Sequence, residues 1–221
     1  MSTQPRASSR TVSVEARRIP LWVRRFVDEH GPTQATVTAD GLYLQAGDQT
    51  TATLVVGVLP WCPPGGTDPQ PNALADALAA HLLADRRCAV LLVRRGGYAV
   101  AVLDGDRVVS SKVGHRYVQG RTAAGGWSQQ RFARRRDNQT AELVGTAAEH
   151  AARLLVGLGA DHLLVPGGDR ALVERVLADP RLRDLARLPR ARHLGVGDPK
   201  AEVLRAVPGL LREVRITITG G

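Results

Sequence analysis

A chain of 221 residues is long enough to form one large domain or two small ones, and either can bury a hydrophobic core. Two cysteines are too few for a disulfide scaffold and suit a reducing, cytoplasmic compartment. No apolar run approaches the length of a membrane span, and residues 1–10 lack the apolar stretch of a secretory signal. We therefore expect a disordered tail over residues 1–10 and no membrane partner. The net charge of +9 instead favours a polyanionic partner.

The positive charge is concentrated in one stretch of the chain. Residues 112–136 hold seven of the nine net charges and no acidic residue, which leaves +2 for the rest. A GC-rich genome also produces many arginines and few lysines, but codon bias would spread them more evenly. The clustering therefore indicates a functional, anion-binding segment. Its basic residues are Lys112, Arg116, Arg121, Arg131, Arg134, Arg135 and Arg136.

Residues 11–70 are predicted to form a small α+β subdomain. A helix is expected over residues 19–30, where apolar residues pair at i, i+4 and a glycine follows. Residues 35–46 alternate around Asp40-Gly41 as a hairpin, and residues 50–60 have the β-branched content of a buried strand. The Pro- and Gly-rich residues 60–71 indicate a linker, so we place a domain boundary there.

Residues 71–221 are predicted to form a second, larger domain. An amphipathic helix precedes three strands, and glycine-containing turns between these strands make them an antiparallel meander. After the basic segment the pattern continues as helix, strand, helix, strand, helix and strand. The expected ranges are 73–86, 88–95, 98–104, 107–113, 139–158, 162–168, 169–179, 192–197, 199–207 and 213–219.

The element order from residue 88 to 197 predicts the fold class. Three meander strands followed by strands that arrive through helices give the order βββαβαβ. This order predicts an α/β fold with an RNase H-like mixed sheet, to which the N-terminal residues add a small α+β extension.

The sequence GGWSQQRFARRR, residues 125–136, has a composition that no hydrophobic core requires. It falls in a predicted loop over residues 114–138, and an unstructured segment of that length inside a compact domain is usually functional or disordered. Gly125 and Gly126 let the backbone approach a ligand closely. Gln129 and Gln130 offer uncharged amides that can orient a water molecule or a reacting group.

The other parts of the same segment suit an RNA-rich site. Arginines neutralise phosphates, and the ring of Trp127 can stack on a base. Backbone N–H groups beside the glycines can stabilise a developing oxyanion. Together these parts predict a loop that docks electrostatically on RNA and assists ester chemistry there.

The segment GGWSQQRFARRRDNQ, between a meander and a long helix, resembles the Gly-Gly-Gln loop in the central domain of archaeal and eukaryotic peptide-release factors. It is more similar still to the Vms-like release factor family, whose members act as peptidyl-tRNA hydrolases in ribosome quality control. Bacterial members of that family carry Gly-Gly-X-Ser-Gln followed by an arginine cluster. The strand–turn–helix VPGGDRALVERVL also resembles the release-factor domain, and the whole resemblance covers residues 88–207.

The resemblance implies release of a nascent chain by hydrolysis of its ester to the tRNA 3′ end, on a stalled or split large ribosomal subunit. It matches Gly125 and Gly126 to the glycine pair and Gln129 to the catalytic glutamine. Gln130 is the close alternative, because Trp127 and a serine separate the glycines from Gln129. The implied partners are the large ribosomal subunit, ribosomal RNA and peptidyl-tRNA, and RNA hydroxyls are implied to contribute to proton transfer. Neither a cofactor, a metal nor DNA is expected.

Two alternatives remain open at this stage. One is endonucleolytic cleavage near the tRNA 3′ end, which also frees the chain but leaves nucleotides attached to it. The other is a non-catalytic ribosome-binding or RNA-binding module that uses the same basic loop. Only the glycine–glutamine part favours an enzyme, since phosphate binding has no use for it. No stop-codon-reading domain is recognised, so termination at stop codons is not expected.

Other reactive side chains are better explained by structure. His115, at the entrance of the loop, more often contacts RNA or solvent than acts as a base. Asp104 and Asp106 flank a turn glycine, and Asp169 suits a helix N-cap. Cys62 has no base marked nearby, and no Cys/His spacing matches a zinc site.

Overall fold

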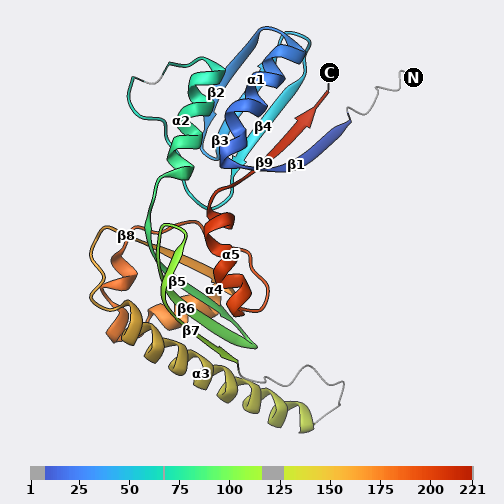
Figure 1. The fold of residues 1–221 in the computed structure, drawn as a ribbon. Helices are drawn as coiled ribbons and strands as arrows, with labels where there is room; N and C mark the ends of the chain where they lie inside the picture. Colours follow the sequence, from blue (N-terminus) through green and yellow to red (C-terminus); the bar gives the residue numbers. More distant parts are fainter. Residues whose placement is uncertain (1–7, 67, 116–126, 221) are drawn as a thin grey trace. The chain divides into compact units, whose positions relative to one another are not determined.

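The computed structural model describes residues 8–66, 68–115 and 127–220, and of residues 127–133 it describes the backbone alone. The chain forms two compact units, each built around its own sheet (Figure 1). The first unit comprises Met1–Ala84 and Pro208–Gly221, and the second comprises Asp85–Val207.

The first unit is a five-stranded antiparallel sheet in the order β1-β9-β4-β3-β2, with two helices on one of its faces (Figure 1). Leu42, Leu54 and Ile216 lie in one row across three strands and are fully buried. The alternation of buried and open positions along β4 follows from the two-residue period of a strand. The elements are β1 (Ser9–Glu15), η1 (Ala16–Arg18), α1 (Ile19–His30), β2 (Thr33–Thr38), β3 (Gly41–Ala46), β4 (Thr51–Val56), α2 (Pro71–Leu83) and β9 (Glu213–Thr219).

The predicted helix over residues 19–30 and the predicted hairpin are confirmed. Gly31, at a φ of +77°, ends α1 and donates its N–H to the carbonyl oxygen of Val27 at 2.9 Å. The expected disordered tail is wrong at its end, because Ser9 and Arg10 belong to β1 and pair with β9.

The predicted domain boundary near residue 70 is wrong. Helix α2 packs against α1 and the sheet of the first unit, so the chain leaves that unit only at Ala84. The last strand also returns to the first unit, where β9 lies between β1 and β4. The sequence predicts β9 as a strand, but its partners β4 and β1 lie about 160 and 200 residues away along the chain, and no local pattern indicates them.

The second unit contains a mixed sheet in the order β7-β6-β5-β8. The first three strands form an antiparallel meander, and β8 joins β5 in parallel after a helical crossover. This mixed α/β sheet confirms the predicted fold class. The elements are β5 (Arg87–Arg94), β6 (Gly97–Asp104), β7 (Arg107–His115), α3 (Trp127–Leu155), β8 (His162–Gly168), α4 (Arg170–Leu177), η2 (Pro180–Leu182) and η3 (Leu185–Arg187), followed by α5 (Ala201–Leu211), which runs into the first unit.

The strand predicted over residues 192–197 is wrong as a continuous element. The chain meets β8 only at two isolated parallel bridges, Leu164 with Arg190 and Gly167 with Leu194. Along β8, the N–H groups of Leu164 and Gly168 donate to this segment at 2.8 and 3.0 Å. The donor expected between them is missing because residue 166 is a proline, and this gap interrupts the ladder.

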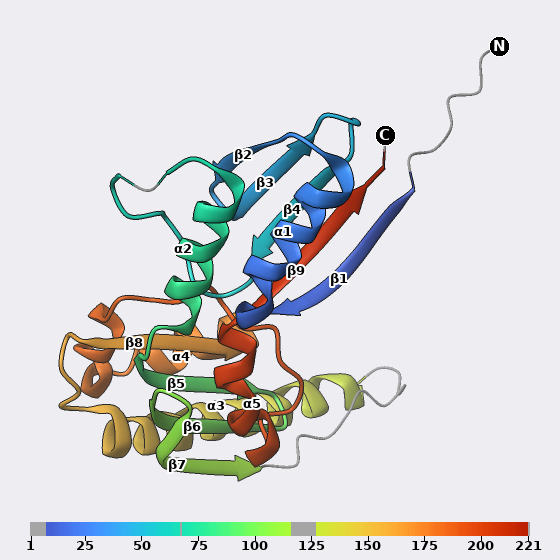
Figure 2. The same cartoon turned by 45° about the horizontal axis from the view of Figure 1, so that its top comes forward.

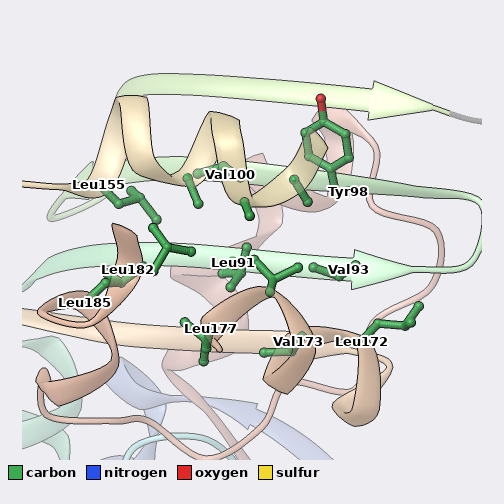
Figure 3. Close-up of a cluster of buried hydrophobic side chains, with 14 of the residues drawn as sticks. Leu91, Val93, Tyr98, Val100, Leu155, Leu172, Val173, Leu177, Leu182 and Leu185 are labelled. Carbon is green, nitrogen blue, oxygen red and sulfur yellow. The ribbon is translucent and has the colours of Figure 1, made fainter. Parts of the chain in front are cut away.

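The core of the second unit lies between the sheet and α3, α4 and the 3₁₀ turns (Figure 3). Leu91 and Val93 of β5 and Tyr98 and Val100 of β6 point to this side. Helix α3 contributes buried residues at regular four-residue intervals, so one stripe of the helix faces the sheet. These residues are Leu143, Ala147, Ala151 and Leu155.

Within the part of the chain that the structure describes, no helix combines the length and the hydrophobicity that crossing a bilayer demands.

The placement of β9 predicts that the C-terminal strand holds the first unit together. Ile216→Ala should lower the free energy of unfolding of that unit by about 2–5 kcal/mol, because the side chain is fully buried between strands. Arg215→Ala, on the opposite face of the same strand and exposed, should change it by less than about 0.5 kcal/mol. Urea denaturation of the two variants compares them, and equal effects would contradict a structural role for β9.

Candidate functional site

The predicted basic loop connects β7 to α3. Strand β7 ends at His115, and α3 begins at Trp127. Helix α3 therefore starts twelve residues before the predicted residue 139. The predicted loop over residues 114–138 is wrong at residues 114–115, which end β7, and again from Trp127 onward. Gly125, Gly126, Arg116 and Arg121 lie outside the described residues.

The glutamine candidates lie on this helix and not in a loop. Trp127, Gln129, Gln130 and Arg131 belong to its first two turns. Sequence patterning missed these turns because they carry no apolar stripe. The signal that was available is intrinsic propensity, since Gln, Arg and Ala all favour helix.

Helix α3 is much longer than the core that it covers. Its 29 residues span about 43 Å at 1.5 Å per residue, yet among the side chains that the structure describes, the first fully buried one is Leu143. No residue between 134 and 142 is fully buried. In Figures 1 and 2 the N-terminal half of the helix runs past the end of β7. The structure thus presents the polar half of α3 beyond the edge of the sheet.

The arginine cluster lies on this projecting half. Arg134 and Arg135 are exposed, and Arg136 is half-buried with its carbonyl oxygen accepting a hydrogen bond from the Thr140 hydroxyl at 2.8 Å. Lys112 is exposed on β7 opposite Val100, which places it on the face of the sheet that α3 covers. The described cations of the basic segment are therefore carried by two neighbouring elements.

The entrance to the undescribed segment is held by a close contact between two strands. Gly114 of β7 pairs with Tyr98 of β6, and a Cβ on Gly114 would lie 2.4 Å from two ring carbons of Tyr98. No side chain fits in that space, so residue 114 must be glycine for the ring to lie flat over the backbone. Gly114, the last residue but one of β7, is thereby packed against the core.

Tyr98 also connects β6 to α3. Its hydroxyl oxygen lies 2.9 Å from Nδ1 of His150, and the two rings stack with centroids 5.5 Å apart. The same Nδ1 lies 2.9 Å from the carbonyl oxygen of Thr146, which can only accept, so Nδ1 carries the proton. Burial, with a smaller contribution from Glu149, raises the pKa of Tyr98. One side chain therefore fixes both β7 and the helix that frame the basic segment.

Sequence reasoning missed Tyr98, Gly114 and His150. Tyr98 stands in an apolar strand and His150 in a helix, and neither pattern distinguishes them from ordinary core or surface residues. The contact depends on strand register, which places Tyr98 opposite Gly114.

The structural explanations of the other reactive side chains agree with the structure. Gly105, at a φ of +57°, forms the turn between Asp104 and Asp106. The Asp169 side chain accepts from the Leu172 N–H at 3.2 Å as an N-cap. His115 is exposed at the end of β7.

The two thiols lie in different environments. Burial raises the pKa of the Cys88 thiol to about 11, while Cys62 is exposed. In residues 8–66, 68–115 and 127–220, no three His, Cys, Asp or Glu side chains form a group that could hold a metal ion.

A protein-family comparison connects this geometry to a known family. The model of the Actinobacteria/chloroflexi VLRF1 release factor matches residues 86–217. The chain belongs to this family. The match covers the second unit almost completely and extends into β9, and it confirms the predicted relation to bacterial Vms-like release factors. A comparison with the curated proteins found no match. Membership of the family gives the chain a release-factor-like role in translation on the ribosome.

The contact between Gly114 and Tyr98 predicts a large effect from one methyl group. Gly114→Ala should lower the free energy of unfolding by about 1–3 kcal/mol, because the ring has to move. Gly145→Ala, in α3 with open space around it, should raise that free energy by about 1 kcal/mol, since alanine favours helix. Thermal denaturation of both variants tests the contact. A Gly114→Ala variant as stable as the wild type would show that the ring does not need this space.

Proposed function

We propose that this protein is a peptidyl-tRNA hydrolase that frees nascent chains from tRNA on stalled or split large ribosomal subunits, as part of ribosome quality control. The observation that carries the proposal is the projecting half of α3, which bears the glutamines and the arginines of the release-factor-like motif. The family match supports the same conclusion.

The exposed arginines of α3 suit the first step, which is binding. Arg134 and Arg135 project into solvent on a helix that has no core partner at that level. A guanidinium group pairs with phosphate in a two-pronged geometry, and it remains charged at any physiological pH. These residues are proposed to hold the tRNA acceptor stem or ribosomal RNA, together with Lys112, Arg116, Arg121, Arg131 and Arg136.

The helical position of the two glutamines favours Gln129 over Gln130 as the catalytic residue. With 3.6 residues per turn, position 129 lies about 40° around the helix from Leu143, and position 130 lies about 140° from it. Position 129 is thus on the stripe that continues the sheet-facing side of α3, while position 130 is on the side of Arg134. Because the two positions are about 100° apart around the helix axis, only one of them can face the ester bond at a time.

The proposed reaction is ester hydrolysis. The oxygen of a water molecule attacks the ester carbonyl carbon, and the bond between that carbon and the 3′ oxygen of the tRNA breaks. One proton of the water goes to the departing 3′ oxygen, so the products are a peptide carboxylic acid and an intact tRNA. The Gln129 amide is proposed to orient the water, with Gly125, Gly126 and Trp127 shaping the approach and RNA hydroxyls relaying the proton. The reaction requires neither a cofactor nor a protein carboxylate, and it takes place in the cytoplasm.

Substitution of the glutamines should separate catalysis from binding. Gln129→Ala should reduce peptide release from purified large subunits carrying peptidyl-tRNA by about 100-fold or more, because the water loses its orientation. The dissociation constant for the subunits should change by less than about twofold. Gln130→Ala is the matched control, and it should retain most of the activity.

Sizing the tRNA 3′ end in the same reaction tests the chemistry. Release with an intact 3′ end supports hydrolysis, while a shortened tRNA would replace this proposal with a nuclease. If the wild-type protein binds the subunits and frees nothing, it is a non-catalytic ribosome-binding module. Release that depends on Gln130 and not on Gln129 would reverse the assignment drawn from helix geometry.

Removal of the exposed arginines should weaken binding in a salt-dependent way. In Arg134→Ala/Arg135→Ala, the slope of log affinity against log salt concentration should fall by about 0.7–0.9 for each phosphate that is no longer neutralised. Arg153→Ala, exposed near the other end of the same helix, is the control and should leave the slope unchanged. Binding to large subunits at several salt concentrations measures the slope. An unchanged slope in the double variant would remove these arginines from the RNA-binding surface.

A further inference from the structure

The basic segment leaves the sheet at the same edge where two other strands end. His115, the last residue of β7, pairs with Gly97, which pairs in turn with Arg94, the last residue of β5. One residue earlier, Val93 of β5 pairs with Gly168, the last residue of β8. At about 4.8 Å between neighbouring strands, these strand ends extend over roughly 15 Å. We call this the segment edge of the sheet.

Three arginines lie along the segment edge outside the basic segment. Arg94 ends β5, Arg95 lies in the turn to β6, and Arg170 begins α4 after the turn that follows β8. All three are exposed. Among the described residues, neither Arg95 nor Arg170 forms an ion pair.

The backbone at this edge holds Arg94 in place. A Cβ on Gly168 would lie 3.0 Å from Cγ of Arg94, so the arginine stem passes directly over this glycine. One guanidinium nitrogen, Nη1, donates to the carbonyl oxygen of Val196 at 2.9 Å. A guanidinium group has five N–H donors, and four remain for a ligand. This anchoring reduces the side-chain entropy that Arg94 would lose on binding.

The opposite edge of the sheet has a different charge. At the ends of the same strands it carries four carboxylates, Asp85, Asp104, Asp106 and Asp161, and three arginines, Arg86, Arg87 and Arg107. Arg87 lies between Asp161 at 3.0 Å and Asp104 at 3.8 Å. At the segment edge, the ends of β5 and β8 and the turns that follow them carry one carboxylate, Asp169, which caps α4. Outside the basic segment, positive and negative charges nearly balance in number. The fold therefore separates them, with most of these carboxylates at the opposite edge and the three arginines at the segment edge.

From this arrangement we propose that Arg94, Arg95 and Arg170 form a second phosphate-binding surface for RNA. The inference rests on the proposed function, because it assigns these residues to the RNA that the basic segment enters. The strand ends of β6, β5 and β8, next to which these arginines lie, extend over about 10 Å, so the three arginines can meet consecutive phosphates of one strand, while Arg134 and Arg135 hold the RNA from α3. Contacts on two elements would fix the orientation of the RNA relative to the start of α3 as well as its affinity.

The test is a charge-matched pair of double variants. Arg95→Ala/Arg170→Ala removes two charges from the segment edge. Arg153→Ala/Arg183→Ala removes two exposed charges near the other end of the core, where Leu155 and Leu182 lie away from Val93, Tyr98 and Leu172 (Figure 3). The measured quantities are the dissociation constant for large ribosomal subunits, from about 50 to 200 mM salt, and the rate of peptide release at saturating protein.

The first double variant should bind the subunits roughly tenfold more weakly at physiological salt, with a salt slope smaller by about 1.5, and the second should match the wild type. Equal behaviour of the two double variants would overturn the proposal. Weaker binding with an unchanged slope would also overturn it, since that result indicates a contact with ribosomal protein. If the segment-edge variant loses binding as expected while the wild type releases no peptide, the RNA surface stands and the hydrolase function fails. If the wild type releases peptide and the variant binds normally, the function stands and this surface fails.

Discussion

The packing of Leu143, Ala147 and Leu155 against the mixed sheet is the interaction on which the rest of the second unit depends. This hydrophobic burial holds the second half of α3 against the sheet. The described residues of the first half, 134–142, have no hydrophobic core beneath them. Because an α-helix is stiff, a helix anchored at one end positions polar residues well beyond that anchor. The projecting half can therefore consist mainly of polar and charged residues, glutamine and arginine above all, without loss of the fold. A loop of the same composition would have to be ordered by its ligand.

Close approach between backbones at the segment edge positions the other end of the basic segment. The ring of Tyr98 lies against Gly114, and Gly168 allows β8 to approach the carbonyl oxygen of Val93, where a Cβ would lie only 2.2 Å away. The Asp169 N–H then donates to that same oxygen at 2.7 Å. These contacts bring three strand ends into register. Tyr98, Gly114 and Gly168 have no proposed role in the reaction, yet their contacts determine where the basic segment leaves the sheet.

The two units differ in how they relate to function. The family match and the candidate residues lie mainly in the second unit, while the first unit is an independent sheet that includes β9 from the end of the chain. The chain therefore passes between the units twice, once at Ala84 and once within α5. This connectivity ties the folding of the first unit to the C-terminal strand, whose residues Val214 and Ile216 are buried in it.

The sequence by itself determined most of the helices and strands, the meander and the location of the charge. The continuous apolar runs of β5 and β6, the turn glycines and the run of arginines are local signals, and such signals can be recognised without knowledge of the fold. It also carried the motif that relates the chain to release factors. The tertiary structure alone decided the packing that anchors the second half of α3, the return of β9 and the separation of charge between the two sheet edges. Each of these depends on which residues far apart in the chain become neighbours. Hydrophobic patterning in a sequence indicates whether a side chain is buried, but it does not indicate which residues pack against that side chain.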